Sequence, residues 1–287
     1  MNRPSVRSRH NTHSGLRTKL ERLPFKSIVR LGSTTSTEEI NRERALKGLQ
    51  PAVFVELNSV DAVKNSSSKL RMKQCFTTGE VKTADWWTKS NTGDGFVNYP
   101  SNVITDINNL SFPIVAKSHF GSRGEGNTLL NSRTELETWM RGKTLNNYIF
   151  EKYYNYSREY RLHIDSEGCF YTCRKMLKRD APEGNKWQRH DDNCVWILEE
   201  NSQFDKPVNW DSIVEHSVKA LNSVGLDVGA VDVRVQSRLD SRDRVRENPD
   251  FIIVEINSAP SFGELTEQHY LTQIPRILNR KRNAQNR

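Results

Sequence analysis

Two oxygen-bearing side chains interrupt an otherwise apolar stretch near the end of this chain. The stretch Phe251-Ile-Ile-Val-Glu-Ile-Asn257 is typical of a β-strand, in which Glu255 and Asn257 share one face. Carboxylate and amide oxygens are the ligands that a hard cation such as Mg²⁺ prefers. A third oxygen donor, Asp232, lies in the β-rich run 229–235. We expect Asp232, Glu255 and Asn257 to bind Mg²⁺, with Mn²⁺ as an alternative ion. The competing interpretation is a solvent-facing position on a half-exposed strand.

A glycine-rich loop is the second feature with chemical potential. Residues 121–127 read Gly-Ser-Arg-Gly-Glu-Gly-Asn and follow an expected strand that ends at Lys117. Three glycines within six positions allow the backbone to approach an anion closely, and Ser122 and Arg123 add donors. The loop lacks the Gly-Lys-Ser/Thr ending of a Walker A loop. The pattern therefore indicates either a loop that covers nucleotide phosphates or an ordinary turn.

The elements that must position these groups are short strands and helices. A β-α-β unit is predicted from a strand over 27–31, a helix over 37–49 and a strand over 52–57. A helical region over 58–79 follows it. Trp86 and Trp87 are expected in a connection and residues 93–102 in a loop. The other expected elements are helices over 132–142 and 210–224, strands over 113–117, 148–152, 160–164, 169–176, 229–235 and 251–257, and an exposed hairpin loop over 236–250.

The charge of the chain is concentrated near its ends. The 287 residues include 43 Lys and Arg against 35 Asp and Glu, and hydrophobic residues make up 35%. Residues 1–24 are rich in basic and polar side chains, and residues 276–287 add five basic ones, so both segments are predicted to be flexible arms. Basic arms favour contact with nucleic acid or anionic substrates, although a net charge of +8 also serves solubility. Nucleic acid remains a partner that the composition permits but does not favour.

Cysteine spacing and hydropathy exclude several classes of protein. Zinc would need more ligands at fitting intervals than the cysteines supply, and we expect reduced, packed thiols. No apolar run reaches the roughly 18 residues that a membrane span needs, and the N-terminus lacks a secretory signal. We therefore expect a cytoplasmic protein with no membrane partner. The four cysteines are Cys75, Cys169, Cys173 and Cys194.

The order of these motifs resembles the ATP-grasp superfamily, and within it the RimK-like carboxylate-amine ligases. The resemblance covers residues 58–275, and the most specific motif is Val-Glu-Ile-Asn-Ser-Ala-Pro-Ser at 254–261. It implies an α+β ATP-grasp fold, in which two α+β subdomains hold ATP between two antiparallel sheets, with Mg²⁺ at the second. The chain then divides into a basic arm (1–24), a short β-α-β unit (25–57), the ATP-grasp domain (58–275) and a basic tail (276–287). The compact size is also similar to ATP-grasp proteins of tailed phages.

The resemblance implies a role for each matching residue. Lys69 and Lys117 would bind the nucleotide phosphates, and Arg161 would face the γ-phosphate and the acyl-phosphate. Glu151 would accept from the adenine amino group, Glu159 would lie near the ribose, and Lys175 would be a further phosphate or adenine contact. The implied catalytic residues are Arg161 and Lys117. The implied nucleotide-binding residues are Lys69, Lys117, Gly121, Ser122, Arg123, Gly124, Glu125, Gly126, Glu151, Lys152, Tyr153, Tyr154, Glu159 and Lys175.

The implied activity is an ATP- and Mg²⁺-dependent ligation of a carboxylate to an amine through an acyl-phosphate. The carboxylate or amine substrate could belong to a peptide or protein. A charged segment over 178–193 is expected to bind an anionic substrate or a polypeptide tail, through Lys178, Arg179, Lys186, Arg189 and His190. Two alternatives stay open, a kinase with the same fold and a nucleic-acid-associated ATP-binding protein.

Overall fold

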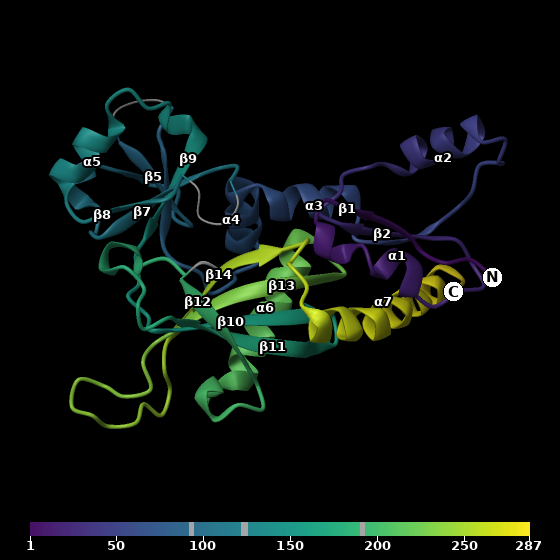
Figure 1. Cartoon of the computed structure of the whole chain (residues 1–287). Helices are drawn as coiled ribbons and strands as arrows, with labels where there is room; N and C mark the ends of the chain where they lie inside the picture. The colour runs from purple at the N-terminus through teal and green to yellow at the C-terminus, as the bar shows by residue number, and fades with distance from the viewer. Residues whose placement is uncertain (92–94, 122–125, 190–192) are drawn as a thin grey trace.

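The computed structural model describes residues 1–91, 95–121, 126–189 and 193–287. In these ranges the chain forms three β-sheets with helices packed against them (Figure 1). The two chain ends lie at the same end of the molecule (Figure 1). None of the helices in these ranges is long and apolar enough to cross a membrane.

The N-terminal part is a small parallel sheet with helices around it. It contains β1 (Ser5–Ser8), α1 (Leu16–Lys19), β2 (Ser27–Leu31), α2 (Thr37–Leu46) and β3 (Val55–Leu57), and the strand order is β1-β2-β3. The expected strand over 27–31 is confirmed. Helix α2 starts at a capping box, in which Ser36 and Glu39 each accept a hydrogen bond from the other's backbone N–H.

The second sheet has six antiparallel strands in the order β6-β5-β4-β9-β7-β8. The expected strand over 148–152 is confirmed, whereas the assignment of Trp86 and Trp87 to a connection is wrong, because both are buried in a strand. A strand also occupies part of the loop expected over 93–102. The elements are β4 (Trp86–Lys89), β5 (Phe96–Tyr99), β6 (Ile104–Thr105), β7 (Ile114–Ser118), β8 (Thr128–Leu130), α5 (Arg133–Met140) and β9 (Tyr148–Lys152).

The third sheet has five antiparallel strands in the order β12-β11-β10-β13-β14. The elements are β10 (Arg158–Asp165), β11 (Gly168–Leu177), β12 (Cys194–Leu198), α6 (Trp210–Val224), β13 (Val228–Val235) and β14 (Phe251–Asn257). Helix α6 has the expected bounds and packs its apolar side on one face of this sheet. The opposite face is therefore the one available for a site.

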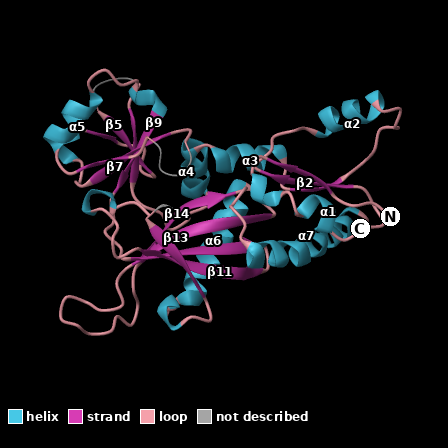
Figure 2. Cartoon of the chain, viewed as in Figure 1, coloured by secondary structure: helices cyan, strands magenta, loops and turns pink. Residues whose placement is uncertain are grey.

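The helical region expected over 58–79 is two helices, α3 (Val60–Ser67) and α4 (Lys69–Thr78). Helix α4 contacts both β9 and β14, and it lies between the two larger sheets (Figure 2). Ser68 separates the two helices and caps the second, because its side chain accepts a hydrogen bond from the Arg71 N–H. Lys69 is therefore held at the first position of α4.

Both predicted arms are wrong as descriptions of the chain. The segment before residue 24 forms β1 and α1, and its leucines pack against α7 (Glu264–Gln285), which also includes most of the supposed basic tail. Within that helix Arg280 pairs with Asp165 at 2.8 Å and Lys281 pairs with Asp227 at 2.6 Å. The composition of these segments did not reveal that a few of their apolar and charged side chains contact residues that are distant in the sequence.

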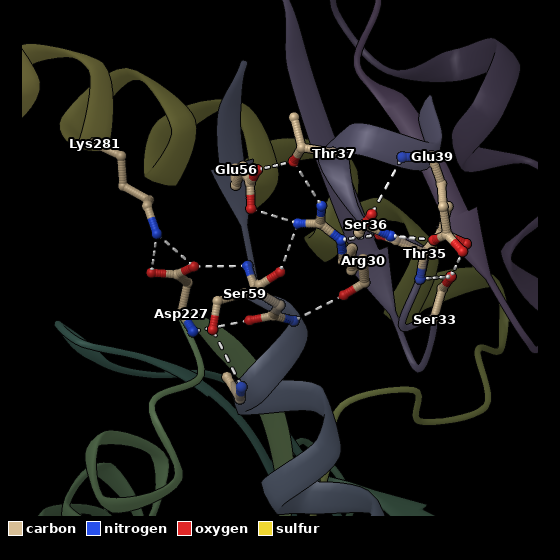
Figure 3. Close-up of polar contacts among 12 residues, drawn as sticks. Arg30, Ser33, Thr35, Ser36, Thr37, Glu39, Glu56, Ser59, Asp227 and Lys281 are labelled. Carbon is tan, nitrogen blue, oxygen red and sulfur yellow. Dashed lines mark hydrogen bonds and ion pairs between the residues drawn. The ribbon is translucent and has the colours of Figure 1, made fainter. Parts of the chain in front are cut away.

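A buried arginine and the neighbouring Asn58 form a polar network that ties the N-terminal sheet to the third sheet (Figure 3). The Arg30 guanidinium has no exposed side-chain surface and donates to Glu56 at 2.7 Å and to the Thr35 carbonyl at 2.7 Å. The neighbouring Asn58 side chain donates to the Arg30 carbonyl and accepts from the backbone N–H of Asp227, where β13 is about to begin. Such satisfied buried polar groups specify one arrangement of the two units.

The order of the N-terminal segment can be tested at Leu16. This side chain is fully buried against α7, so Leu16→Ala should lower the free energy of unfolding by about 2–5 kcal/mol, as measured by urea denaturation. The exposed Thr18 of the same helix is the control, and Thr18→Ala should change stability by less than about 0.5 kcal/mol. Equal small effects at both positions would support the flexible arm instead.

Candidate active site

Charged side chains form a row across the third sheet. The antiparallel register places Arg161 opposite Asp232, and Asp232 opposite Glu255. Nε and Nη2 of Arg161 donate to the two carboxylate oxygens of Asp232 at 2.7 and 2.8 Å. Two residues further along β14, the Asn257 amide donates to Glu255 Oε1 at 3.1 Å. The structure thus brings together the three residues predicted as metal ligands and the predicted catalytic arginine.

A β-bulge decides which way the β14 side chains point. Asp232 pairs with Glu255, but the next residue, Val233, pairs with Ile253, so Val254 is the extra residue. Ile253 and Ile256 both pack into the core under the sheet, although strict alternation would put them on opposite faces. The extra residue of the bulge restores the alternation of side chains between the two faces of the sheet, so Glu255 points away from that core.

The oxygen set fits a hard divalent cation. Burial would raise the pKa of Asp232, but Arg161 and Lys175 more than offset this and hold it at about 2, so the carboxylate is charged at neutral pH. Glu255 Oε2 and Asn257 Oδ1 have no hydrogen-bond partner among the described residues. The described chain holds no cluster of three or more His, Cys, Asp or Glu suited to a metal ion. Two carboxylates and an amide therefore match Mg²⁺ better than zinc.

A second buried carboxylate on the same face is held by three cations. Glu159 accepts from Lys175 at 3.3 Å and from Arg234 at 2.9 Å, and Arg189 lies 3.7 Å away. Burial would raise the pKa of Glu159, but these cations lower it below its ordinary value. Arg189 also donates to the Ser157 carbonyl at 2.9 Å. Arg189 is therefore held beside Glu159, and its expected role in binding an anionic substrate stays a prediction.

A third buried carboxylate lies on the six-stranded sheet. Glu151 of β9 pairs with Lys117 of β7 at 2.7 Å and with Lys73 of α4 at 3.4 Å. Burial would raise the pKa of Glu151, but the two lysines hold it below its ordinary value. Each carboxylate oxygen already pairs with a lysine, so Glu151 could accept a hydrogen bond from the adenine amino group only if one oxygen served both partners.

Helix α4 supplies two lysines one turn apart on the same face. Lys69 donates to the Gly121 carbonyl at 2.8 Å, at the start of the glycine-rich loop. Burial lowers the pKa of Lys69, and the nearby Glu255 partly offsets this. Lys73, which the sequence reasoning missed, is fully buried, and burial lowers its pKa to about 8. The sequence signal for Lys73 was its position four residues after Lys69, which places both side chains on one face of a helix.

The remaining predicted residues lie around the glycine-rich loop and the β9–β10 connection. Ser122, Arg123, Gly124 and Glu125 lie outside the described residues, as does His190. Gly126 has a φ of +74°, a conformation that favours glycine. In the connection, Tyr153 donates its backbone N–H to the Pro113 carbonyl at 2.9 Å, and Lys152 donates to the Asp85 carbonyl at 2.9 Å. The ammonium of Lys152 lies 5.3 Å from the ring centre of Tyr154.

Solved structures share this arrangement of sheets. A D-alanine–D-alanine ligase from Bacillus anthracis superposes with a TM-score of 0.62 at 13% identity, over 99% of both chains. A biotin carboxylase from Campylobacter jejuni, in a β-γ-ATP complex, gives 0.56 at 15% identity, over 88% of this chain and 54% of the other. A carboxyaminoimidazole ribonucleotide synthase from Aspergillus clavatus, complexed with ATP, gives 0.51 at 14% identity, over 81% and 53%.

The chain has the ATP-grasp fold. It spans the full length of the D-alanine–D-alanine ligase but only about half of the other two ATP-grasp proteins. No protein-family model matches the sequence, and no curated protein matches it. The expected α+β fold class is confirmed.

The buried Lys73 predicts a specific dependence of stability on pH. Because its pKa falls from 10.5 to about 8 on folding, the unfolded chain binds more protons between these values, and the free energy of unfolding rises with pH. This contribution amounts to at most about 1.4 kcal/mol per pH unit. Lys73→Met should remove it, so urea unfolding between pH 8 and pH 10 should show a smaller slope in the variant. Lys64→Met on the surface of α3 leaves the buried cluster intact and serves as the control. Identical slopes in all three proteins would contradict the assignment.

Proposed function

We propose that this protein is an ATP- and Mg²⁺-dependent ligase that joins a carboxylate to an amine through an acyl-phosphate. The observation that carries the proposal is that cationic side chains lie on both sides of the space between the two antiparallel sheets. Lys69 and Lys117 come from α4 and the six-stranded sheet, while Arg161 and Lys175 come from the five-stranded sheet beside the metal-type oxygens. A polyphosphate between the sheets would meet positive charge from both sides.

Three of the four cations in this site already have a carboxylate partner that fixes their position. Arg161 is fixed by two hydrogen bonds to Asp232, and Lys117 by one to Glu151. Donors held in place before the reaction stabilise developing charge without the cost of reorganising in the transition state. Lys69 lies at the glycine-rich loop, where it could contact the phosphates as that loop covers them.

The reaction that suits this site has two displacements. A carboxylate oxygen attacks the γ-phosphorus of ATP, the bond to the bridging oxygen breaks, and ADP leaves with the electron pair. The amine then attacks the acyl carbon, phosphate leaves, and the nitrogen releases a proton. Arg161 would stabilise the phosphoryl and acyl oxygens, while exclusion of water would protect the acyl-phosphate.

Mg²⁺ would be held by Asp232, Glu255 and Asn257, and it would neutralise charge on the phosphoryl oxygens. The motif order around Arg161 and Asn257 supports a RimK-like ligase, and the amine could belong to a peptide or protein. The basic side chains at the chain ends give less support to nucleic-acid binding than their number suggests, because Arg280 and Lys281 are paired within the fold.

The proposal is tested by titration calorimetry of ATP and a nonhydrolysable analogue, with and without Mg²⁺. Wild-type protein should bind with micromolar affinity in the presence of Mg²⁺, and the double variant Glu255→Ala, Asn257→Ala should lose the Mg²⁺-dependent part. Removal of two oxygen ligands is expected to weaken binding at least about tenfold.

The matched control is the double variant Glu247→Ala, Asn248→Ala, which changes the same two residue types in an exposed loop. This control should bind ATP as the wild type does. ADP release that needs both a carboxylate and an amine then identifies the ligase, whereas ADP release with a hydroxyl substrate alone would identify a kinase. Absence of ATP binding by the wild type would overturn the proposal.

A further inference from the structure

A cavity of about 270 Å³ lies next to Arg161, on the side away from Glu159. Its floor is the site face of β10, β11 and β12, and its wall is the start of α7 with the segment before it. Trp196 and Leu198 contribute from β12, Tyr171 from β11 and Leu265 from α7. Three segments that are distant in the sequence therefore enclose a mainly apolar space beside the catalytic arginine.

The titratable groups deep in this cavity are uncharged at neutral pH. Burial lowers the pKa of His163 to about 3, and it raises the pKa of the Cys173 thiol to about 12. The acid Glu264 lies exposed at the rim. Apart from Arg161, the interior thus offers neutral walls, and a charged side chain of a ligand would lose its hydration there without finding a partner.

Arg161 supplies the one charged group on the cavity wall that has a spare donor. Its Nε and Nη2 bind Asp232, whereas Nη1 has no hydrogen-bond partner among the described residues. The guanidinium also lies 4.9 Å from the ring centre of Trp196, which keeps it against the apolar wall. A ligand in the cavity can therefore place an anionic group at Nη1 and an apolar group among the aromatic and aliphatic side chains.

We propose that this cavity binds the apolar side chain of the carboxylate substrate, whose carboxylate lies at Arg161. The inference rests on the proposed ligase function and adds the class of acid to it. A volume of about 270 Å³ is below the roughly 300–1,000 Å³ of sites for drug-sized ligands, so it suits a single amino-acid-sized group. The acid is either a free amino acid or the last residue of a peptide, since both present the same carboxylate and side chain.

Leu198 and Val195 provide a matched pair for the test. Trp196 and Leu198 point into the cavity from β12, whereas Val195 lies on the other face of the same strand and is 37% exposed. Leu198→Phe fills the cavity and Leu198→Ala enlarges it, while Val195→Phe introduces the same aromatic ring outside it. Calorimetry with ATP and Mg²⁺ on each variant checks that the nucleotide site is intact.

The experiment measures hydroxamate formation and ADP release with hydroxylamine as the amine. N-acetylglycine, N-acetylleucine and N-acetylglutamate are compared with free leucine and with a tetrapeptide ending in leucine, and N-acetylphenylalanine is added for the Leu198→Ala variant. Wild-type kcat/KM for N-acetylleucine should exceed that for the other two N-acetyl acids at least about tenfold. Leu198→Phe should lower it at least about tenfold but leave N-acetylglycine within about twofold, and Leu198→Ala should shift preference toward N-acetylphenylalanine. A comparison of free leucine with the tetrapeptide distinguishes a free amino acid from a peptide end.

Calorimetric titration of N-acetylleucine onto the protein with the nonhydrolysable ATP analogue gives a second readout. No preference for the apolar acid, or equal effects of Leu198→Phe and Val195→Phe, would overturn the inference and leave the ligase proposal standing. Weaker ATP binding by Leu198→Phe would also overturn it, because the cavity would then belong to the nucleotide. Loss of ATP binding in the wild type would instead remove the ligase proposal, and the titration would still report whether the cavity binds the acid.

Discussion

The register of four antiparallel strands is the constraint on which the site depends. It aligns Cys173, Arg161, Asp232 and Glu255 in one row across β11, β10, β13 and β14. A slip of one residue in any strand would send its member of the row into the core, because neighbouring side chains point to opposite faces. The apolar residues beneath the sheet therefore fix the positions of the charged residues above it. The bulge at Val254 is part of the same constraint, since it lets β14 keep its apolar residues in the core and its proposed oxygen ligands on the site face.

Charge balance explains how so many cations can be buried around one site. Glu151, Glu159 and Asp232 are each held by two or more basic side chains, and all three have lowered pKa values despite burial. Removing one partner from such a group would leave an uncompensated charge, which typically costs about 3–5 kcal/mol. These buried ion pairs are therefore weak evidence for a stable fold, but they are strong evidence that the basic side chains are fixed in position in advance. Anionic phosphates entering between the sheets would meet basic side chains whose directions are already fixed.

Local patterns predicted the strands and the motif residues, whereas contacts between distant segments could not be predicted from the sequence. The oxygen pair of β14 and the helix α6 were readable because alternation and helical periodicity are local properties. The N-terminal segment was misread, since its sparse leucines gain meaning only against α7, about 250 residues later. Lys73 was missed because a lysine inside a helix is ordinarily exposed, and only the packing of α4 between two sheets buries it. The apolar cavity was equally hidden, because its walls come from three separate segments.

The N-terminal segment also contacts the backbone that follows β14. His13 hydrogen-bonds to the Pro260 carbonyl at 2.7 Å, and the Thr12 hydroxyl accepts from the Phe262 backbone N–H at 3.0 Å. Gly32 lies so close to Ala259 that a side chain there would meet it at 2.7 Å. All three contacts hold the short segment that joins the proposed oxygen ligands of β14 to the cavity wall at the start of α7. The N-terminal unit, although small, therefore acts on the site by fixing a stretch of backbone that the proposed metal ligands and the proposed substrate cavity share.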